Sequence, residues 1–164
     1  MKTKFIFFII ILAIVTEGIT TFVLNRIQQN ISTEPQITSN NILSECTTHA
    51  VGHVHYHAQL TITINGKNFP VPPNAGIDAG CMHPLHTHDA SGTIHIDYYK
   101  PHSFTIGDFF TDWGMIFNRY QLGNLLMGQR YSMKMSVNKK ENHEYEKYII
   151  KDHDIIDIVV TTKK

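Results

Sequence analysis

Histidine is the residue type in this chain whose spacing could support chemistry. The chain of 164 residues contains 11 histidines, and most of them fall in one short region: His49, His53, His55, His57, His83, His86, His88 and His95. Imidazole binds zinc, copper, iron and nickel, and a divalent ion needs three or four ligands that converge on one point. These histidines form a metal site only if the fold brings their rings together.

The stretch PLHTHDASGTIHIDY, residues 84–98, predicts a β-hairpin that brings two histidines face to face. Its centre, DASG, has the composition of a turn. If the hairpin closes at the centre of this turn, His86 lies opposite His95, with Cβ atoms about 5 Å apart. In the same register His88 lies opposite Thr93. We therefore predict a metal site, called the hairpin site below, formed by His86, His88 and His95.

Two acidic residues accompany this predicted site. Asp97 falls on the same face of the hairpin as His86 and His95, where it could be a fourth ligand or a hydrogen-bond acceptor that orients a ring. Asp89, which follows His88, is a further candidate for that role, and both carboxylates are candidates for a general acid or base. Three histidine ligands also leave one position open for water or a substrate, as in catalytic zinc sites.

A second group of histidines occupies one face of a predicted strand. The stretch HVHYHAQLTITI, residues 53–64, alternates strictly between an apolar face and a face that carries His53, His55 and His57. Successive histidines on such a strand lie about 7 Å apart, so all three rarely reach one ion. We expect one or two of them to complete the hairpin site from a neighbouring strand, or to form a second ion site nearby.

The rest of the chain must supply the elements that position these strands. NGK at residues 65–67 favours a tight hairpin turn. A helix is predicted over residues 105–118, because Thr105 and Asp108 form a capping-box-like start. Apolar residues then follow at helical spacing and are expected in the core: Phe109, Phe110, Trp113, Ile116 and Phe117.

The predicted fold is α+β: a strand-rich single domain, residues 46–164, with one helix on a mixed or antiparallel sheet. Residues 131–137 and 155–162 are the later strands. Met133 and Met135, on one face of the first of these, are expected as core residues rather than as copper ligands. The order of hairpin, helix and closing strand is β-grasp-like by analogy.

The first 24 residues predict an export signal. Lys2 and Lys4 precede a mostly apolar segment, Phe5–Leu24, about as long as a membrane span. Residues 16–18 fit a small-x-small cleavage site poorly. We therefore favour an uncleaved signal-anchor over a cleaved signal peptide, which would leave the protein secreted.

Both a signal-anchor and a cleaved signal peptide would export the folded domain. The two lysines place the N-terminus inside the cell, so a single-pass anchor in the cell membrane leaves residues 46–164 outside the cytoplasm. Residues 25–45 are rich in Asn, Gln, Ser and Thr and are expected to be a polar linker.

Cys46 and Cys81 are the two cysteines of the chain, and in an exported protein they most simply form a disulfide. The bond would stabilise the fold by about 4 kcal/mol in the chain-entropy model. The alternative is that Cys81, Met82 and His83 supply soft ligands for copper.

Charge and motifs narrow the function classes. Lys plus Arg equals Asp plus Glu at 14 each, so no basic field is available to hold nucleic acid. Neither a Ser/His/Asp or Cys/His nucleophile pattern nor a phosphate-binding loop is recognisable. The first hypothesis is a metal-binding module, a carrier or an accessory domain of an unidentified membrane complex. The alternative is a metalloenzyme whose metal activates water or a small substrate. In both, zinc is preferred over copper.

Three blocks of the chain resemble those of an uncharacterised family of exported, His-rich archaeal and bacterial proteins: HVHYHAQLTITINGK, CMHPLHTHDASGTIHID and FTIGDFFTDWG. The resemblance covers residues 50–160. It implies no activity, because no function is assigned to that family. Asp97 stands where the family has an acidic residue, often Glu, so carboxylate chemistry is kept at this position.

Overall fold

The computed structural model describes residues 42–47 and 54–163, all of which belong to one compact unit, Ser39–Lys164. The predicted membrane segment, most of the linker, His49 and His53 lie outside the described residues. Within the described part, no helix is long and apolar enough to cross a membrane.

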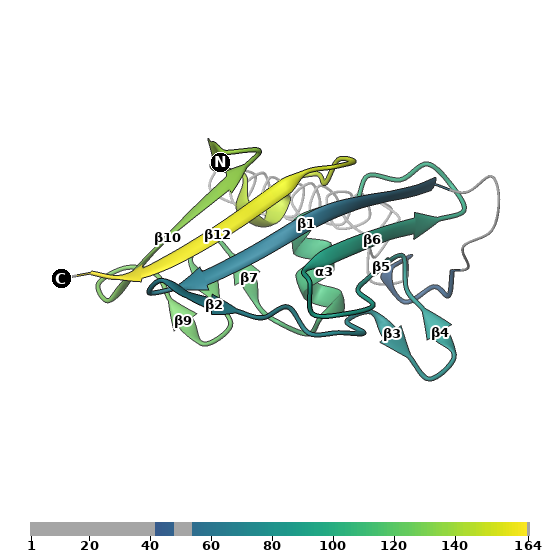
Figure 1. Ribbon diagram of the computed structural model, residues 1–164, viewed down its shortest axis with the longest axis horizontal. Helices are drawn as coiled ribbons and strands as arrows, with labels where there is room; N and C mark the ends of the chain where they lie inside the picture. Colours follow the sequence, from purple (N-terminus) through teal and green to yellow (C-terminus); the bar gives the residue numbers. More distant parts are fainter. Residues whose placement is uncertain (1–41, 48–53, 164) are drawn as a thin grey trace, which may run out of the picture. The chain divides into compact units, whose positions relative to one another are not determined.

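A curled mixed sheet of seven strands is the frame of the molecule (Figure 1). Six strands follow one another across it: β11 (Lys140–Asn142), β10 (Tyr131–Val137), β12 (Ile155–Thr162), β1 (Val54–Ile64), β6 (Thr93–Tyr98) and β5 (Leu85–His86). The seventh, β2 (Lys67–Phe69), pairs with β1. Strands β1 and β12 are parallel, and the other pairs are antiparallel. This confirms the predicted strand-rich α+β fold with a mixed sheet.

Smaller elements surround this frame. Two short sheets are formed by β3 (Ile77–Asp78) with β4 (Cys81–Met82), and by β7 (Phe117–Asn118), β8 (Gln121–Leu122) and β9 (Leu125–Leu126). The helix α3 (Ile106–Asp112) and the 3-10 turn η1 (Tyr145–Lys147) complete the described elements. Figure 1 shows α3 behind β1 and β6.

Strand β1 pairs with three other strands of the sheet. Its first half pairs with β6, and its second half pairs with β12 and β2. The alternation seen in the sequence is confirmed, since Ala58, Leu60 and Ile62 are buried on one face. The turn to β2 is confirmed as well: Asn65 and Gly66 both have positive φ, as tight hairpins require.

Helix α3 begins as predicted and ends earlier. The Thr105 hydroxyl accepts a hydrogen bond from the Asp108 amide at 3.1 Å, and the Asp108 carboxylate accepts one from the Thr105 amide at 2.8 Å. Gly114 then takes a φ of +75°, and the chain leaves the helix for β7. Ile116, predicted to lie in the core, is 56% exposed, so the prediction of a helix through residue 118 was wrong.

The core lies on the face of the sheet that α3 covers. It contains Phe109 and Phe110 from the helix, together with Met133 and Met135 from β10, which confirms these methionines as core residues. Leu43 is also buried in this core. The folded unit therefore includes residues upstream of Cys46.

Cys46 and Cys81 form a disulfide, with 5.0 Å between their Cα atoms. Beside it, the Thr47 amide donates to the Met82 carbonyl oxygen at 2.7 Å. The bond fastens the start of the folded unit to β4. A disulfide-bonded Cys81 cannot be a thiolate ligand. The alternative of a soft copper site at Cys81, Met82 and His83 was therefore wrong in its use of Cys81.

Candidate metal centre

The predicted hairpin register is confirmed. Strand β5 pairs with β6 so that His86 lies opposite His95. The pairing stops there, because Thr87 turns inward: its hydroxyl donates to the Pro72 carbonyl at 2.7 Å and accepts from the Ala75 amide at 3.1 Å. The predicted pairing of His88 with Thr93 is therefore wrong. His88 approaches the site from the turn after β5.

Strand β1 brings the second group of histidines to the same place. Its register with β6 sets His57 opposite His95 and His55 opposite Asp97. Strand β6 thus lies between β5 and β1, and His95 has a histidine on each side. His55 and His57 thus reach His95, one residue of the hairpin site, from a neighbouring strand.

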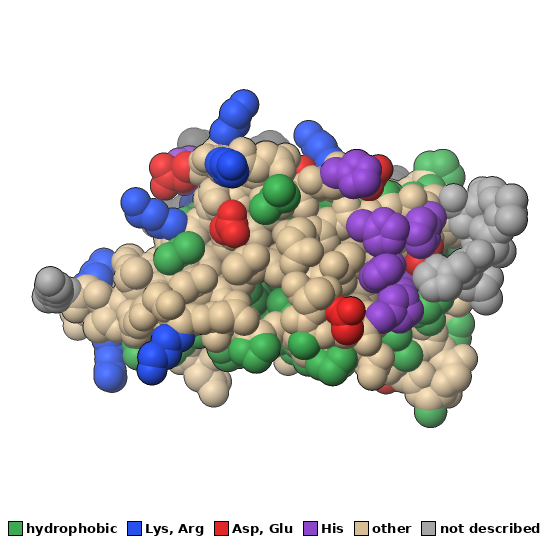
Figure 2. All heavy atoms as spheres, viewed as in Figure 1, with side chains coloured by type: hydrophobic (Ala, Val, Ile, Leu, Met, Phe, Trp, Pro, Cys, Tyr) green, Lys and Arg blue, Asp and Glu red, His purple; other side chains and the backbone are tan. Residues whose placement is uncertain are grey.

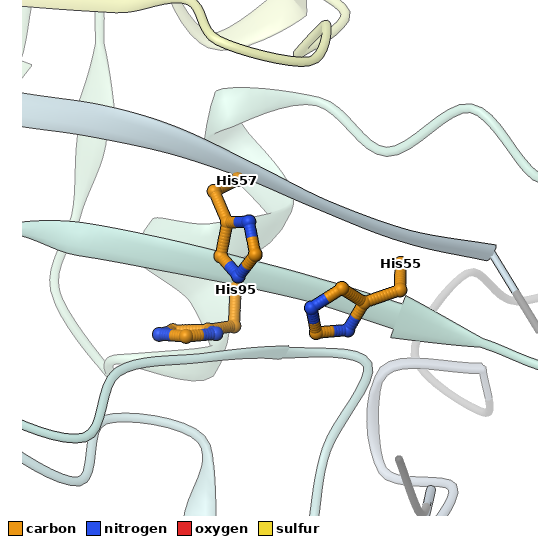
Figure 3. Close-up of side chains that lie close together, drawn as sticks. All are labelled: His55, His57 and His95. Atoms are coloured by element: carbon orange, nitrogen blue, oxygen red, sulfur yellow. The ribbon is translucent and has the colours of Figure 1, made fainter. Parts of the chain in front are cut away.

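The rings form two groups of three that share His95. The hairpin site contains His86, His88 and His95, and a second group, called the strand site below, contains His55, His57 and His95 (Figure 3). Within each group the nitrogen atoms that could bind an ion lie within 4.8 Å of one another. Zinc–imidazole bonds are about 2.0–2.1 Å long, so nitrogens on one ion lie at most about 4 Å apart. Side-chain rotations that bring these nitrogens within about 4 Å of one another would close either group around an ion.

Ring contacts connect the two groups into one cluster, defined here as His55, His57, His86, His88 and His95. The His95 ring centroid lies 4.5 Å from that of His57, 4.6 Å from His88 and 5.3 Å from His86. Figure 2 shows histidine side chains gathered on the near face of the molecule, opposite the helix side of the sheet. His86 is buried, whereas His55 and His88 are exposed, so the cluster extends from the interior to the surface.

Hydrogen bonds set the orientation of two of the rings. The Nδ1 atom of His86 donates to the His83 carbonyl oxygen at 2.9 Å, and Nδ1 of His55 bonds to Oδ1 of Asp97. With the ring proton on Nδ1, the lone pair that binds a metal is on Nε2 in both residues. Such acceptors commonly orient metal-binding histidines.

Asp97 lies between the two groups. Its carboxylate is 1% exposed. While Oδ1 contacts His55, Oδ2 lies 3.7 Å from Nε2 of His86. An ion bound to His86 would therefore be close to a carboxylate oxygen. This position suits both roles considered for Asp97, a fourth ligand and an acceptor that orients a ring.

Burial keeps the central rings in the form that binds metals. It lowers the pKa of His86 from 6.5 to about 4 and that of His95 likewise to about 4, although the nearby Asp97 carboxylate opposes the shift. Both imidazoles are consequently neutral at pH 7. Metal binding requires neutral imidazole, so no proton has to be removed from either ring before it accepts a first ion.

Asp89 has a different setting from Asp97. It is exposed, and its Oδ1 accepts a hydrogen bond from the Ser91 amide at 2.8 Å. Hydrogen bonds with Ser91 lower the pKa of the Asp89 carboxyl. The side chain therefore stabilises the turn between β5 and β6. Its role as an acid or base stays a prediction.

A histidine–aspartate pair next to the hairpin site, His83 with Asp112, was not predicted from the sequence. Nδ1 of His83 lies 2.7 Å from Oδ1 of Asp112, and burial raises the pKa of the Asp112 carboxyl. The pair helps to fix His83, whose carbonyl oxygen orients His86. The sequence contains no signal for it, because Asp112 is contributed by α3. The other three histidines that the structure describes, His102, His143 and His153, are exposed.

Comparison with known proteins adds no further assignment. No protein-family model, no curated protein and no solved structure matches this chain. The functional inference therefore rests on the geometry of the histidine cluster.

Proposed function

We propose that this protein binds a transition-metal ion outside the cytoplasm, and that the hairpin site is the principal binding site. The observation that carries the proposal is the β5–β6 register, which sets His86 directly opposite His95 with His88 beside both. Three imidazoles that approach one another fit zinc, and they also accept copper. Zinc is the preferred ion, because the cysteines are in a disulfide and supply no soft ligand.

The test is metal content by elemental analysis of the full chain, purified in detergent without a histidine tag. The variant His86→Ala/His88→Ala/His95→Ala is compared with a matched control, His102→Ala/His143→Ala/His153→Ala, which removes three exposed histidines outside the cluster. We expect the wild type and the control to hold zinc or copper and the first variant to lose it while retaining its circular dichroism spectrum. Equal metal content in all three proteins contradicts the proposal.

The location is part of the same proposal. We propose that Phe5–Leu24 anchors the chain in the cell membrane and that the metal-binding domain faces outward. The resemblance of the sequence blocks to a family of exported, His-rich proteins supports export. The disulfide supports an oxidising compartment. Protease added to intact cells should remove the domain and leave the anchor in the membrane fraction. Protection of the domain in intact cells contradicts this location.

A metalloenzyme is the second candidate function. The position of Asp97 favours it, because a buried carboxylate beside a bound ion can accept a proton from metal-bound water. Exchange of the ion separates the two functions. A carrier releases its zinc to a competing chelator within minutes and shows no turnover, whereas a catalytic centre retains one ion and loses activity in the variant Asp97→Asn.

A further inference from the structure

The two histidine groups overlap in one residue, His95, and that residue occupies the middle of the cluster. It faces His57 on β1 and His86 on β5. The remaining ligands divide cleanly, with His55 and His57 on one side and His86 and His88 on the other. Two complete sets of three ligands are therefore available only if His95 serves both.

The two ring nitrogens of His95 point in different directions. Figure 3 shows one of its nitrogens on the side of His57 and His55 and the other directed away from both. Its Nδ1 atom is buried and makes no hydrogen bond to any described residue. A buried polar atom in this state is unfavourable, and a bound ion would satisfy it.

Asp97 supplies negative charge between the two groups. One carboxylate oxygen contacts His55 of the strand site, and the other lies 3.7 Å from His86 of the hairpin site. Two divalent ions on opposite sides of one ring repel each other, and an anionic group between them reduces the repulsion. The buried carboxylate is therefore placed where a pair of ions needs it.

We infer that the histidine cluster is a centre for two divalent transition-metal ions, with His95 as the shared ligand that binds one ion through each ring nitrogen. This inference rests on the proposed function, in which the hairpin site binds the first ion. Neutral His95 has one nitrogen lone pair and one N–H group. Binding of the second ion displaces the N–H proton to solvent, and no oxidant or reductant is needed.

The test is titration of the full chain with Cu²⁺, followed by elemental analysis and electron paramagnetic resonance. We expect two ions per chain and a resonance intensity well below that of two isolated Cu²⁺ ions, because ions bridged by one imidazole ring couple magnetically. The variant His57→Ala should bind one ion and regain the full intensity of a single isolated Cu²⁺. The variant His55→Ala, which removes an exposed ring, should behave in the same way and replaces His57→Ala if that protein misfolds.

The exposed His153 provides the matched control, since His153→Ala should retain both ions. Binding of a single ion that is lost in His88→Ala but retained in His57→Ala and His55→Ala overturns the two-ion inference and leaves the proposed function intact. Two ions with the full intensity of two isolated spins also overturn it, because His95 then does not bridge them. Absence of any bound ion overturns both proposals.

Discussion

At the scale of single residues, Asp97 is the side chain whose charge matters most to the site. The variant Asp97→Asn keeps the shape of the side chain and removes the negative charge between His55 and His86. We expect it to weaken zinc binding by about 10- to 100-fold, the range found for groups that orient metal-binding histidines. Competition with a chelator of known affinity measures the change.

The comparison with Asp89→Asn gives this prediction its control. Asp89 accepts its hydrogen bond in the exposed turn. Its replacement by the neutral amide in Asp89→Asn should therefore change zinc affinity much less than Asp97→Asn does. An equal loss in the two variants would show that net charge, rather than the position of Asp97, controls binding.

The pKa values of His86 and His95 predict how the metal-free protein responds to acid. In the unfolded chain both groups titrate near pH 6.5, whereas in the folded protein burial lowers each pKa to about 4. Between these values the unfolded state binds more protons, so the free energy of unfolding decreases as the pH falls from about 6.5 towards 4. Above pH 7 neither group contributes.

Urea unfolding of the metal-free protein between pH 7.5 and 5 measures this effect. We expect the midpoint to fall as the pH drops below about 6.5 and the slope to be smaller in His95→Gln, which removes one of the two groups. A midpoint that is constant over this range is inconsistent with a lowered pKa of His86 and His95 in the folded protein.

At the scale of elements, the β5–β6 hairpin must stay in register for the site to exist. Gly92, the residue before β6, has a φ of +85°, and a Cβ atom at this position would collide with the Leu60 carbonyl oxygen. Gly66, in the β1–β2 turn, has a φ of +77° but open space around it. Comparing alanine variants at the two positions therefore distinguishes the cost of backbone strain from the cost of a steric collision.

We expect Gly66→Ala to destabilise the fold by about 1–2 kcal/mol, the cost of a left-handed conformation. Gly92→Ala should cost at least about 1 kcal/mol more, because β6 must move away from β1. It should also weaken zinc binding, since His95 and His57 then separate. Thermal unfolding and zinc titration of the two variants check both effects, and equal stability of the variants would refute the collision.

The hairpin and the helix also show which features of the fold could be predicted from local sequence patterns. The turn composition of DASG and the alternation in residues 84–98 were enough to predict that His86 faces His95, because both are local signals. The end of β5 was not predictable, since Thr87 turns inward to contact Pro72 and Ala75, and these contacts come from another part of the chain. Helix α3 ended early because Gly114 leaves the helical conformation.

At the scale of the whole molecule, the disulfide joins the start of the folded unit to β4. Replacing both cysteines, Cys46→Ala/Cys81→Ala, should lower the free energy of unfolding by about 4 kcal/mol in the chain-entropy model and leave the zinc content unchanged. Thermal unfolding and elemental analysis measure the two outcomes. Loss of zinc in a folded double variant would show that the cysteines contribute to the site.

Long-range strand pairing is the part of the fold that could not be predicted from local sequence patterns. The alternation in β1 predicted which histidines share a face, but not that β6 would be its neighbour with His57 opposite His95. The parallel pairing of β1 with β12 joins segments at opposite ends of the domain, and local patterns contain no information on it. The β-grasp-like analogy stays a prediction. The full histidine cluster is thus a product of tertiary structure.

The most direct test of the proposed metal centre is the zinc affinity of a single variant, His95→Ala, measured by calorimetric titration of the full chain. His95 belongs to both histidine groups. We therefore predict that zinc affinity falls by more than the roughly 10- to 100-fold that is typical when a group that orients a ligand is lost, whereas the exposed control His143→Ala binds like the wild type. Unchanged zinc binding in a folded His95→Ala protein would contradict the claim that this cluster is a metal centre.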